Sequence, residues 1–198
     1  MSFVVAEIFG FTCLDNRLYV VYYLHAAIHV YTADTFSEVS VITVDELMAA
    51  WDIIACPDDH QLYVIGGLRS IWRVSAVNPT DYELWLRVRD ESRLGTYTLS
   101  LTSRRLLVLV TSPWYGSLHL SLHQYNTVNK ELLRVIDLSN SVKSPTHAVE
   151  TSRDTFVVSH DEPHSGVSQL FSFIHLFIGF TSTIRCVIVV MWRNISPH

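Results

Sequence analysis

The chain has 198 residues, of which 49% are hydrophobic and 17% are charged, and its formal net charge is −5. This apolar content excludes a disordered chain, because enough surface can be buried to offset the entropy lost on ordering. The weak negative charge offers no basic surface for nucleic acid, so a nucleic-acid partner is not expected.

The N-terminal residues MSFVVAEIFGFT have no positive charge ahead of a short apolar run. They do not have the pattern of a signal peptide, and a cytoplasmic location is expected. Cys13, Cys56 and Cys186 form neither a CxxC pair nor a zinc-binding spacing. We therefore expect buried free thiols.

A strand-like triplet recurs along the chain. Leu18-Tyr19-Val20 is followed after 44 residues by Leu62-Tyr63-Val64, and after another 44 residues by Leu106-Leu107-Val108. A fourth copy is Thr155-Phe156-Val157. An interval in the forties is typical of a β-propeller blade, which has four strands in about 40–50 residues.

The sequence around each triplet also repeats. A polar turn precedes the triplet, and an alternating strand, a second turn and an outer strand follow it. First strands are predicted at residues 51–56, 97–101 and 147–150, third strands at 28–31, 71–74, 122–125 and 167–170, and outer strands at 39–44, 84–88 and 132–136. One short helix is a candidate at residues 43–51, where Val44, Leu47 and Met48 have helical spacing.

The repeat predicts an all-β chain, a β-propeller of four-stranded antiparallel blades with about four blades present. The predicted blades are residues 11–46, 51–92, 95–138 and 145–170, within one domain at 1–170. Since closure removes the exposed sheet edges, four blades are expected to be a fragment of a six-bladed propeller. A β-sandwich would also have short strands, but it requires no fixed interval.

The repeat stops near Leu170, and residues 171–198 form a hydrophobic C-terminal tail. Residues 171–192 approach the length of a membrane span, although Arg185 at its centre would cost about 2.5–3.5 kcal/mol. Three interpretations stay open for this tail: a final pair of strands, a membrane anchor, or a segment foreign to the fold. Contact with a membrane is expected only through this tail.

Several segments resemble one family, the NHL-like six-bladed propellers of animals. They are residues 51–56, 61–64, 71–75, 98–103, 105–108, 131–135, 147–150 and 155–160. The resemblance implies a binding platform, while the absence of RING, B-box and coiled-coil patterns means that ubiquitin-ligase activity is not implied. Gly66-Gly67, with Trp85 downstream, is similar to a kelch blade, but only one repeat carries the glycine pair.

The candidate partner-binding residues are Trp72, Arg73, Trp114 and Tyr115. Trp114 and Tyr115 lie in a longer loop, and exposed aromatic residues are good anchors for a partner. Residues 160–164 combine two histidines with two carboxylates, but no other segment supplies a matching ligand, so a solvated loop is preferred over a metal site. We expect no catalytic residues, no metal and no cofactor.

The leading hypothesis is a non-catalytic binding or scaffold module for a protein partner. The alternative is a calcium-dependent hydrolase or lactonase on a six-bladed propeller, with Asp52, Ser100 and Glu150 as polar residues of the central channel. A further alternative is a truncated gene product without a folded function.

Overall fold

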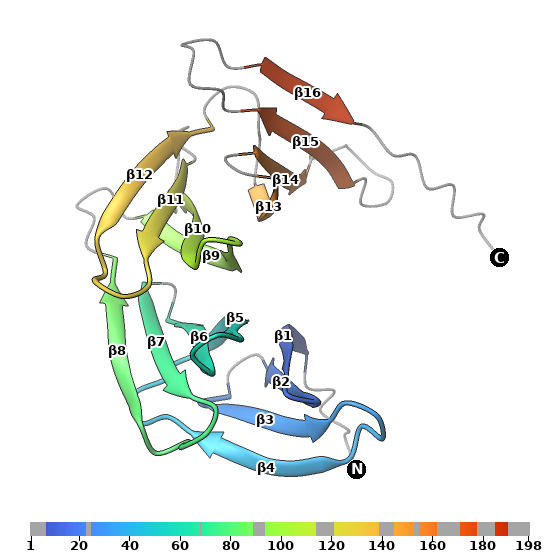
Figure 1. The fold of residues 1–198 in the computed structure, drawn as a ribbon, viewed down its shortest axis with the longest axis vertical. Helices are drawn as coiled ribbons and strands as arrows, with labels where there is room; N and C mark the ends of the chain where they lie inside the picture. The colour runs from blue at the N-terminus through green and yellow to red at the C-terminus, as the bar shows by residue number, and fades with distance from the viewer. Residues whose placement is uncertain are drawn as a thin grey trace, which may run out of the picture.

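The computed structural model describes residues 7–22, 25–67, 69–88, 94–113, 121–138, 145–152, 155–161, 171–177 and 185–189. All regular elements in these ranges are β-strands, and they form four antiparallel sheets of four consecutive strands each. The sheets follow one another around an open arc, with the first strand of each on the inside (Figure 1). This is the arrangement of a β-propeller, and each sheet is one blade.

The blades divide the chain in sequence order, as the repeat predicts. Blade 1 contains β1 (Ile8–Leu14), β2 (Arg17–Tyr22), β3 (Ala27–Thr32) and β4 (Glu38–Thr43). Blade 2 contains β5 (Ala50–Cys56), β6 (Gln61–Gly66), β7 (Ser70–Ser75) and β8 (Tyr82–Arg87). Blade 3 contains β9 (Leu94–Leu101), β10 (Leu106–Pro113), β11 (Ser121–Asn126) and β12 (Leu132–Asp137). Blade 4 contains β13 (Pro145–Ser152), β14 (Thr155–Asp161), β15 (Phe171–Phe177) and β16 (Arg185–Val189).

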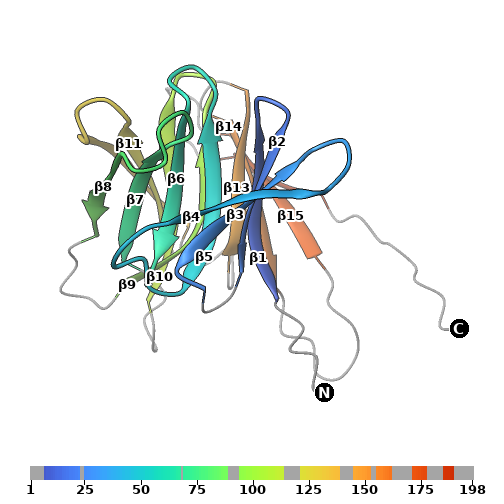
Figure 2. The ribbon, with the colours of Figure 1, turned by 90° about the horizontal axis from the view of Figure 1, so that it is seen from below.

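The blades are twisted, and their turns use residues that tolerate left-handed backbone. In Figure 2, β1 and β2 run along the short axis of the molecule while β3 and β4 cross it, which is the twist expected of β-sheets. Asp15 and Asn16 join β1 to β2 with φ angles of 49° and 58°. Two consecutive positive φ values fit the two-residue hairpin turn that matches strand twist, and Asp and Asn tolerate them.

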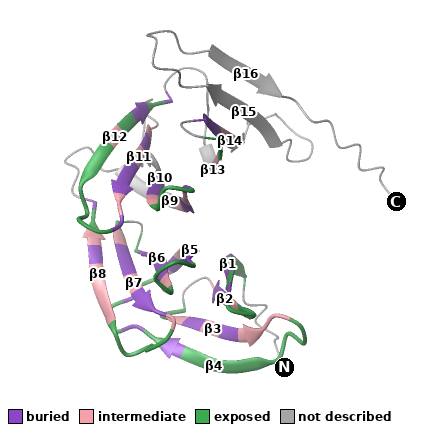
Figure 3. Ribbon diagram, in the orientation of Figure 1, coloured by how far each residue is buried: buried purple, intermediate pink, exposed green. Residues whose placement is uncertain are grey.

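The hydrophobic core lies in the seams between blades. Leu62 and Val64 of β6 belong to the cluster shared with blade 1, whereas Tyr63 and Ile65 belong to the cluster shared with blade 3. All four side chains are fully buried, because alternate residues of a strand point to opposite faces of its sheet. A third cluster joins blades 3 and 4 around Phe156. Figure 3 shows β6 and β7 mostly buried, while β4 and β12 are mostly exposed.

Blade 3 is displaced by one residue relative to the predicted repeat. Leu107 and Leu109 face blade 2, and Val108 faces blade 4. Leu107, not Leu106, therefore takes the place that Leu62 has in blade 2. A displacement of one residue exchanges the two faces of a strand. The pattern of buried side chains therefore reveals the displacement, although the residue types of the triplet still match those of the other blades.

The described part of the hydrophobic tail belongs to blade 4. Residues of β15 pair with β14 along its whole length, and β16 pairs with β15. Within residues 171–177 and 185–189 the tail forms a pair of strands, β15 and β16. The third strand predicted at 167–170, and the boundary at Leu170, lie outside the described residues. No helix in the described ranges is long and apolar enough to span a membrane.

Two smaller expectations are corrected. Residues 44–49 form a turn and not a helix: the Leu47 N–H donates to the Val44 carbonyl at 3.0 Å, and Glu46 has a φ of 66°. Cys56 is buried as expected, whereas Cys13 is exposed because it lies on the face of blade 1 that points away from blade 2. The side chain of Cys186 lies outside the described part.

Candidate partner-binding groove

The four predicted partner-binding residues do not form one described surface. Trp72 is 6% exposed and packs in the seam between blades 1 and 2, with its ring edge-on to Tyr82 at 6.3 Å. Trp114 and Tyr115 lie outside the described residues. The structure thus places the Trp72 indole in the core.

Arg73 forms an ion pair with one acidic residue of the same sheet, Glu83. Its Nη2 lies 2.9 Å from Oε1 of Glu83 on β8, and Lys130 Nζ of blade 3 lies 3.3 Å from the same oxygen. All three side chains are 35–42% exposed. Exposed ion pairs of this kind contribute at most about 1 kcal/mol. Arg73 is therefore partly open to solvent, and it shares the single negative charge of Glu83 with Lys130.

Asp52, one of the predicted channel residues, joins two blades. Its Oδ1 accepts the N–H of Ile53 at 2.9 Å, and its Oδ2 accepts the N–H of Leu99 on β9 at 2.8 Å. Burial raises the pKa of the carboxyl from 3.8 to about 7, although both hydrogen bonds oppose that shift. On β1, Gly10 approaches so closely that a Cβ there would lie 2.7 Å from Oδ1. The carboxyl group is thus enclosed by the inner strands of three blades.

Glu150 and Ser100 also lie at a seam between blades. Glu150 Oε2 accepts the N–H of Ser103 at 3.3 Å, its Oε1 lies 3.5 Å from Nη2 of Arg104, and its side chain is 3% exposed. Ser100 is 6% exposed and, as the partner of Val108 across β9 and β10, faces blade 4. The three predicted channel residues bond to or pack against neighbouring blades instead of meeting at one point.

Histidine and carboxylate groups do not gather into a metal centre in the described ranges. The side chains of residues 160–164, the other candidate cluster, lie outside the part of the chain that the structure describes. On the surface, His60 Nδ1 lies 2.7 Å from Asp15 Oδ2, and Arg105 Nε lies 2.6 Å from Asp58 Oδ2. Each pair connects the first turn of one blade to the first turn of the next.

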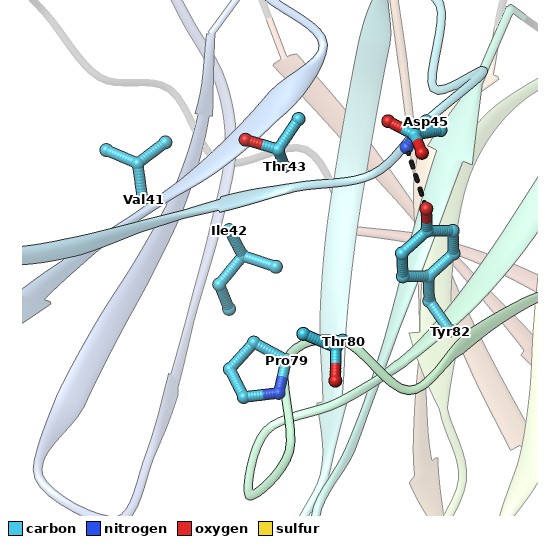
Figure 4. A pocket seen from close by; sticks show the side chains of 7 residues that line it. All are labelled: Val41, Ile42, Thr43, Asp45, Pro79, Thr80 and Tyr82. Atoms are coloured by element: carbon cyan, nitrogen blue, oxygen red, sulfur yellow. Dashed lines mark hydrogen bonds between the residues drawn. The ribbon is translucent and has the colours of Figure 1, made fainter.

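A groove lies between the outer strand of blade 1 and the turn joining β7 to β8 in blade 2. Its volume is about 390 Å³. The residues that line it are Val41, Ile42, Thr43, Asp45, Pro79, Thr80 and Tyr82 (Figure 4). The Asp45 N–H donates to the Tyr82 hydroxyl at 3.4 Å, which connects its two walls. The repeat gave no sign of this groove, because its walls belong to different blades.

The groove combines apolar walls with an acidic margin. Ile42 is 4% exposed and belongs to the core, while Val41 on the other face of the same strand is 45% exposed. Three exposed carboxylates lie at this margin. Asp45 lines the groove, Glu46 follows Asp45 in sequence, and Asp81 follows the lining residue Thr80. Segments 38–48 and 76–82 contain no lysine or arginine. The groove therefore presents apolar contacts beside negative charge, with no basic residue in either of these two segments.

Comparison with known proteins supports the fold. No family model and no curated protein matches the chain. A Bacteroides caccae protein of unknown function is 12% identical with a TM-score of 0.59, covering 93% of this chain and 61% of that one. Raptor from Chaetomium thermophilum is 12% identical with a TM-score of 0.62, covering 90% of this chain and 15% of that one. The WD40 β-propeller domain of Doa1 is 13% identical with a TM-score of 0.59, covering 78% and 48%.

The chain spans less than two thirds of each of these structures. At such identities the likeness concerns the fold alone, which is a β-propeller.

Proposed function

We propose that this chain is a non-catalytic β-propeller module that binds a protein partner through the groove between blades 1 and 2. The observation that carries the proposal is a contrast between the carboxylates at the inner seams and the groove at the outer strands. The carboxylates of Asp52 and Glu150 are occupied by backbone N–H groups of the neighbouring blade. The groove, in contrast, has an exposed Pro79 and a half-buried Tyr82 beside the buried Ile42.

The composition of the groove fits a protein interface. Interfaces have an apolar centre enriched in aromatic residues, surrounded by a polar rim. Here Ile42, Pro79 and Tyr82 would form the centre, and Thr43, Thr80 and Asp45 would form the rim. The resemblance of the sequence to NHL-like propellers supports the same function, and the proposal keeps that blade type and a six-bladed parent propeller.

Capture of partners with a blocked groove tests the proposal. Thr80→Arg places a long charged side chain in the groove, and Val128→Arg makes the same kind of change in the corresponding turn of blade 3, where Val128 is 82% exposed. Proteins cross-linked to the wild-type chain in cells should be retained by Val128→Arg and lost with Thr80→Arg. The same captured proteins with all three chains would contradict the proposal. Calcium-dependent lactone hydrolysis that is abolished by Asp52→Asn would contradict it as well.

A further inference from the structure

The outer strand of blade 1 is an open sheet edge. In the described residues β4 pairs with β3 and with no other strand. Its Val39 and Val41 side chains are 52% and 45% exposed. The outer edge of such a strand presents backbone N–H and C=O groups that a further strand can pair with.

This edge carries fewer charges than the corresponding strands of the next two blades. Exposed edges are usually guarded by charged residues or proline, which disfavour pairing with another chain. β8 carries Glu83 and Arg87, and β12 carries Arg134 and Asp137. β4 has one charged residue, Glu38 at its first position. From Val39 to Thr43 it reads VSVIT, which has no charge and no proline and is rich in β-branched residues. Among these three edges, β4 is the one suited to receive a strand.

The surroundings of the β4 edge determine which strand would fit. The groove begins at residues 41–43 of β4, so a strand beside them could insert one apolar side chain between Ile42, Pro79 and Tyr82. Beyond Thr43 the chain continues into Asp45 and Glu46, and Asp81 follows Thr80 on the opposite wall. Negative charge without a basic residue in either segment favours a cationic side chain on the incoming strand.

We infer that β4 receives an additional β-strand from the protein partner, an extended segment that alternates apolar residues with lysine or arginine. The inference rests on the proposed function and specifies the chemistry of its partner. Main-chain hydrogen bonds to the β4 edge give affinity, and the groove and the acidic margin give side-chain specificity. The inference therefore excludes two other kinds of partner: an anionic peptide, and a folded surface that binds without backbone hydrogen bonds to β4.

Short synthetic peptides test this chemistry directly. The probes are a fluorescent heptapeptide of alternating valine and lysine, the same peptide with glutamate for lysine, and the valine–lysine peptide N-methylated at alternate residues. Fluorescence anisotropy with the full chain should show the valine–lysine peptide binding at least about tenfold tighter than either of the others. Raising the salt concentration should weaken it, because the ion pairs are exposed.

Charge reversal supplies the variant test. The double variant Asp45→Lys/Asp81→Lys should bind the valine–glutamate peptide more tightly than the valine–lysine peptide. Asp59→Lys, an exposed aspartate in the first turn of blade 2, serves as the matched control and should keep the wild-type preference. A reversed preference is an outcome that simple unfolding of the variant would not produce.

The results separate this inference from the proposed function. Equal binding of the three peptides, or a preference that charge reversal leaves unchanged, would overturn the strand addition. If protein capture were still lost with Thr80→Arg, the binding module would stand and only its strand-addition chemistry would be wrong. If capture did not depend on Thr80, the proposed function would fail whatever the peptides did.

Discussion

Replacing Asp52 with asparagine should remove a loss of stability that the wild-type chain shows as pH rises from about 4 to about 7. Burial raises the pKa of the Asp52 carboxyl from 3.8 to about 7 in the folded chain. The folded state therefore favours the protonated form, and the free energy of unfolding falls where the unfolded chain has lost its proton and the folded chain has not. About three pKa units at about 1.4 kcal/mol each give an upper limit of about 4 kcal/mol.

Urea unfolding of both proteins from pH 4 to pH 8 measures this effect. The quantity of interest is the difference between wild type and Asp52→Asn, because other titrating groups cancel in it. His147 is one such group: burial lowers its pKa, so its contribution to stability is lost as pH falls. The asparagine side chain has one oxygen to accept the N–H groups of Ile53 and Leu99, where aspartate has two. This lowers the free energy of unfolding of the variant by an amount that does not vary with pH. Parallel stability curves for the two proteins would refute the reasoning.

Three further changes test the packing of the blades. Gly10→Ala brings a Cβ within 2.9 Å of the Asp52 Cα, so the backbone must shift at a cost of about 1–3 kcal/mol; an unchanged melting temperature would contradict the close approach. Phe156→Ala, at a fully buried site, should cost about 3–5 kcal/mol in urea unfolding, whereas Phe11→Ala, at a 66% exposed site, should cost about 0.5 kcal/mol or less. Equal losses would show that the assigned faces are wrong. Arg105→Ala removes an exposed ion pair and should cost less than about 1 kcal/mol, an effect that disappears in high salt; a larger loss that persists in salt would contradict this.

Much of the strand layout was predictable because both faces of the two middle blades are covered. A strand buried on both sides must carry apolar residues at nearly every position, and the runs at Leu62–Ile65 and Leu106–Leu109 stand out for that reason. The predicted third strand at 71–74 lies within β7, and the predicted outer strand at 132–136 lies within β12. The positions of the strands were therefore easier to predict than the blade toward which each side chain points.

The direction in which a strand's side chains point, and the residues at which the strand ends, depend on contacts between residues that are distant in sequence. Leu106, Leu107 and Val108 fit the triplet as letters, but only the packing of Leu107 against blade 2 shows the displaced register. Val44, Leu47 and Met48 have helical spacing, yet Val44 and Leu47 are buried in the seam by a turn. In the same way Asp52, selected as a channel residue, accepts a hydrogen bond from Leu99, 47 positions away. The groove was missed for the same reason.

The first blade repeats less clearly than the second, and one difference lies on the face that no described strand of another blade covers. Cross-strand pairing places Phe11 beside Val20 and His29 on the face of blade 1 that points away from blade 2. The corresponding face of blade 2 has Val64 beside Trp72, and blade 1 covers it. A covered position demands an apolar side chain, whereas an uncovered position does not.

On the outer half of this face, which no described strand of another blade covers, β3 carries polar side chains beside the exposed Val41 of β4. His29 stands where blade 2 has Trp72, and its Nδ1 lies 3.1 Å from Glu38 Oε2. Tyr31 stands where blade 2 has Val74, and its hydroxyl lies 2.9 Å from that of Tyr22. Burying such a network beneath an apolar blade would remove its contact with water without new hydrogen-bond partners, at a cost of about 1–3 kcal/mol for each unpaired group. Apolar side chains are exposed on this face on both inner and outer strands, at Phe11 of β1 and at Val41 of β4, the cross-strand partner of His29.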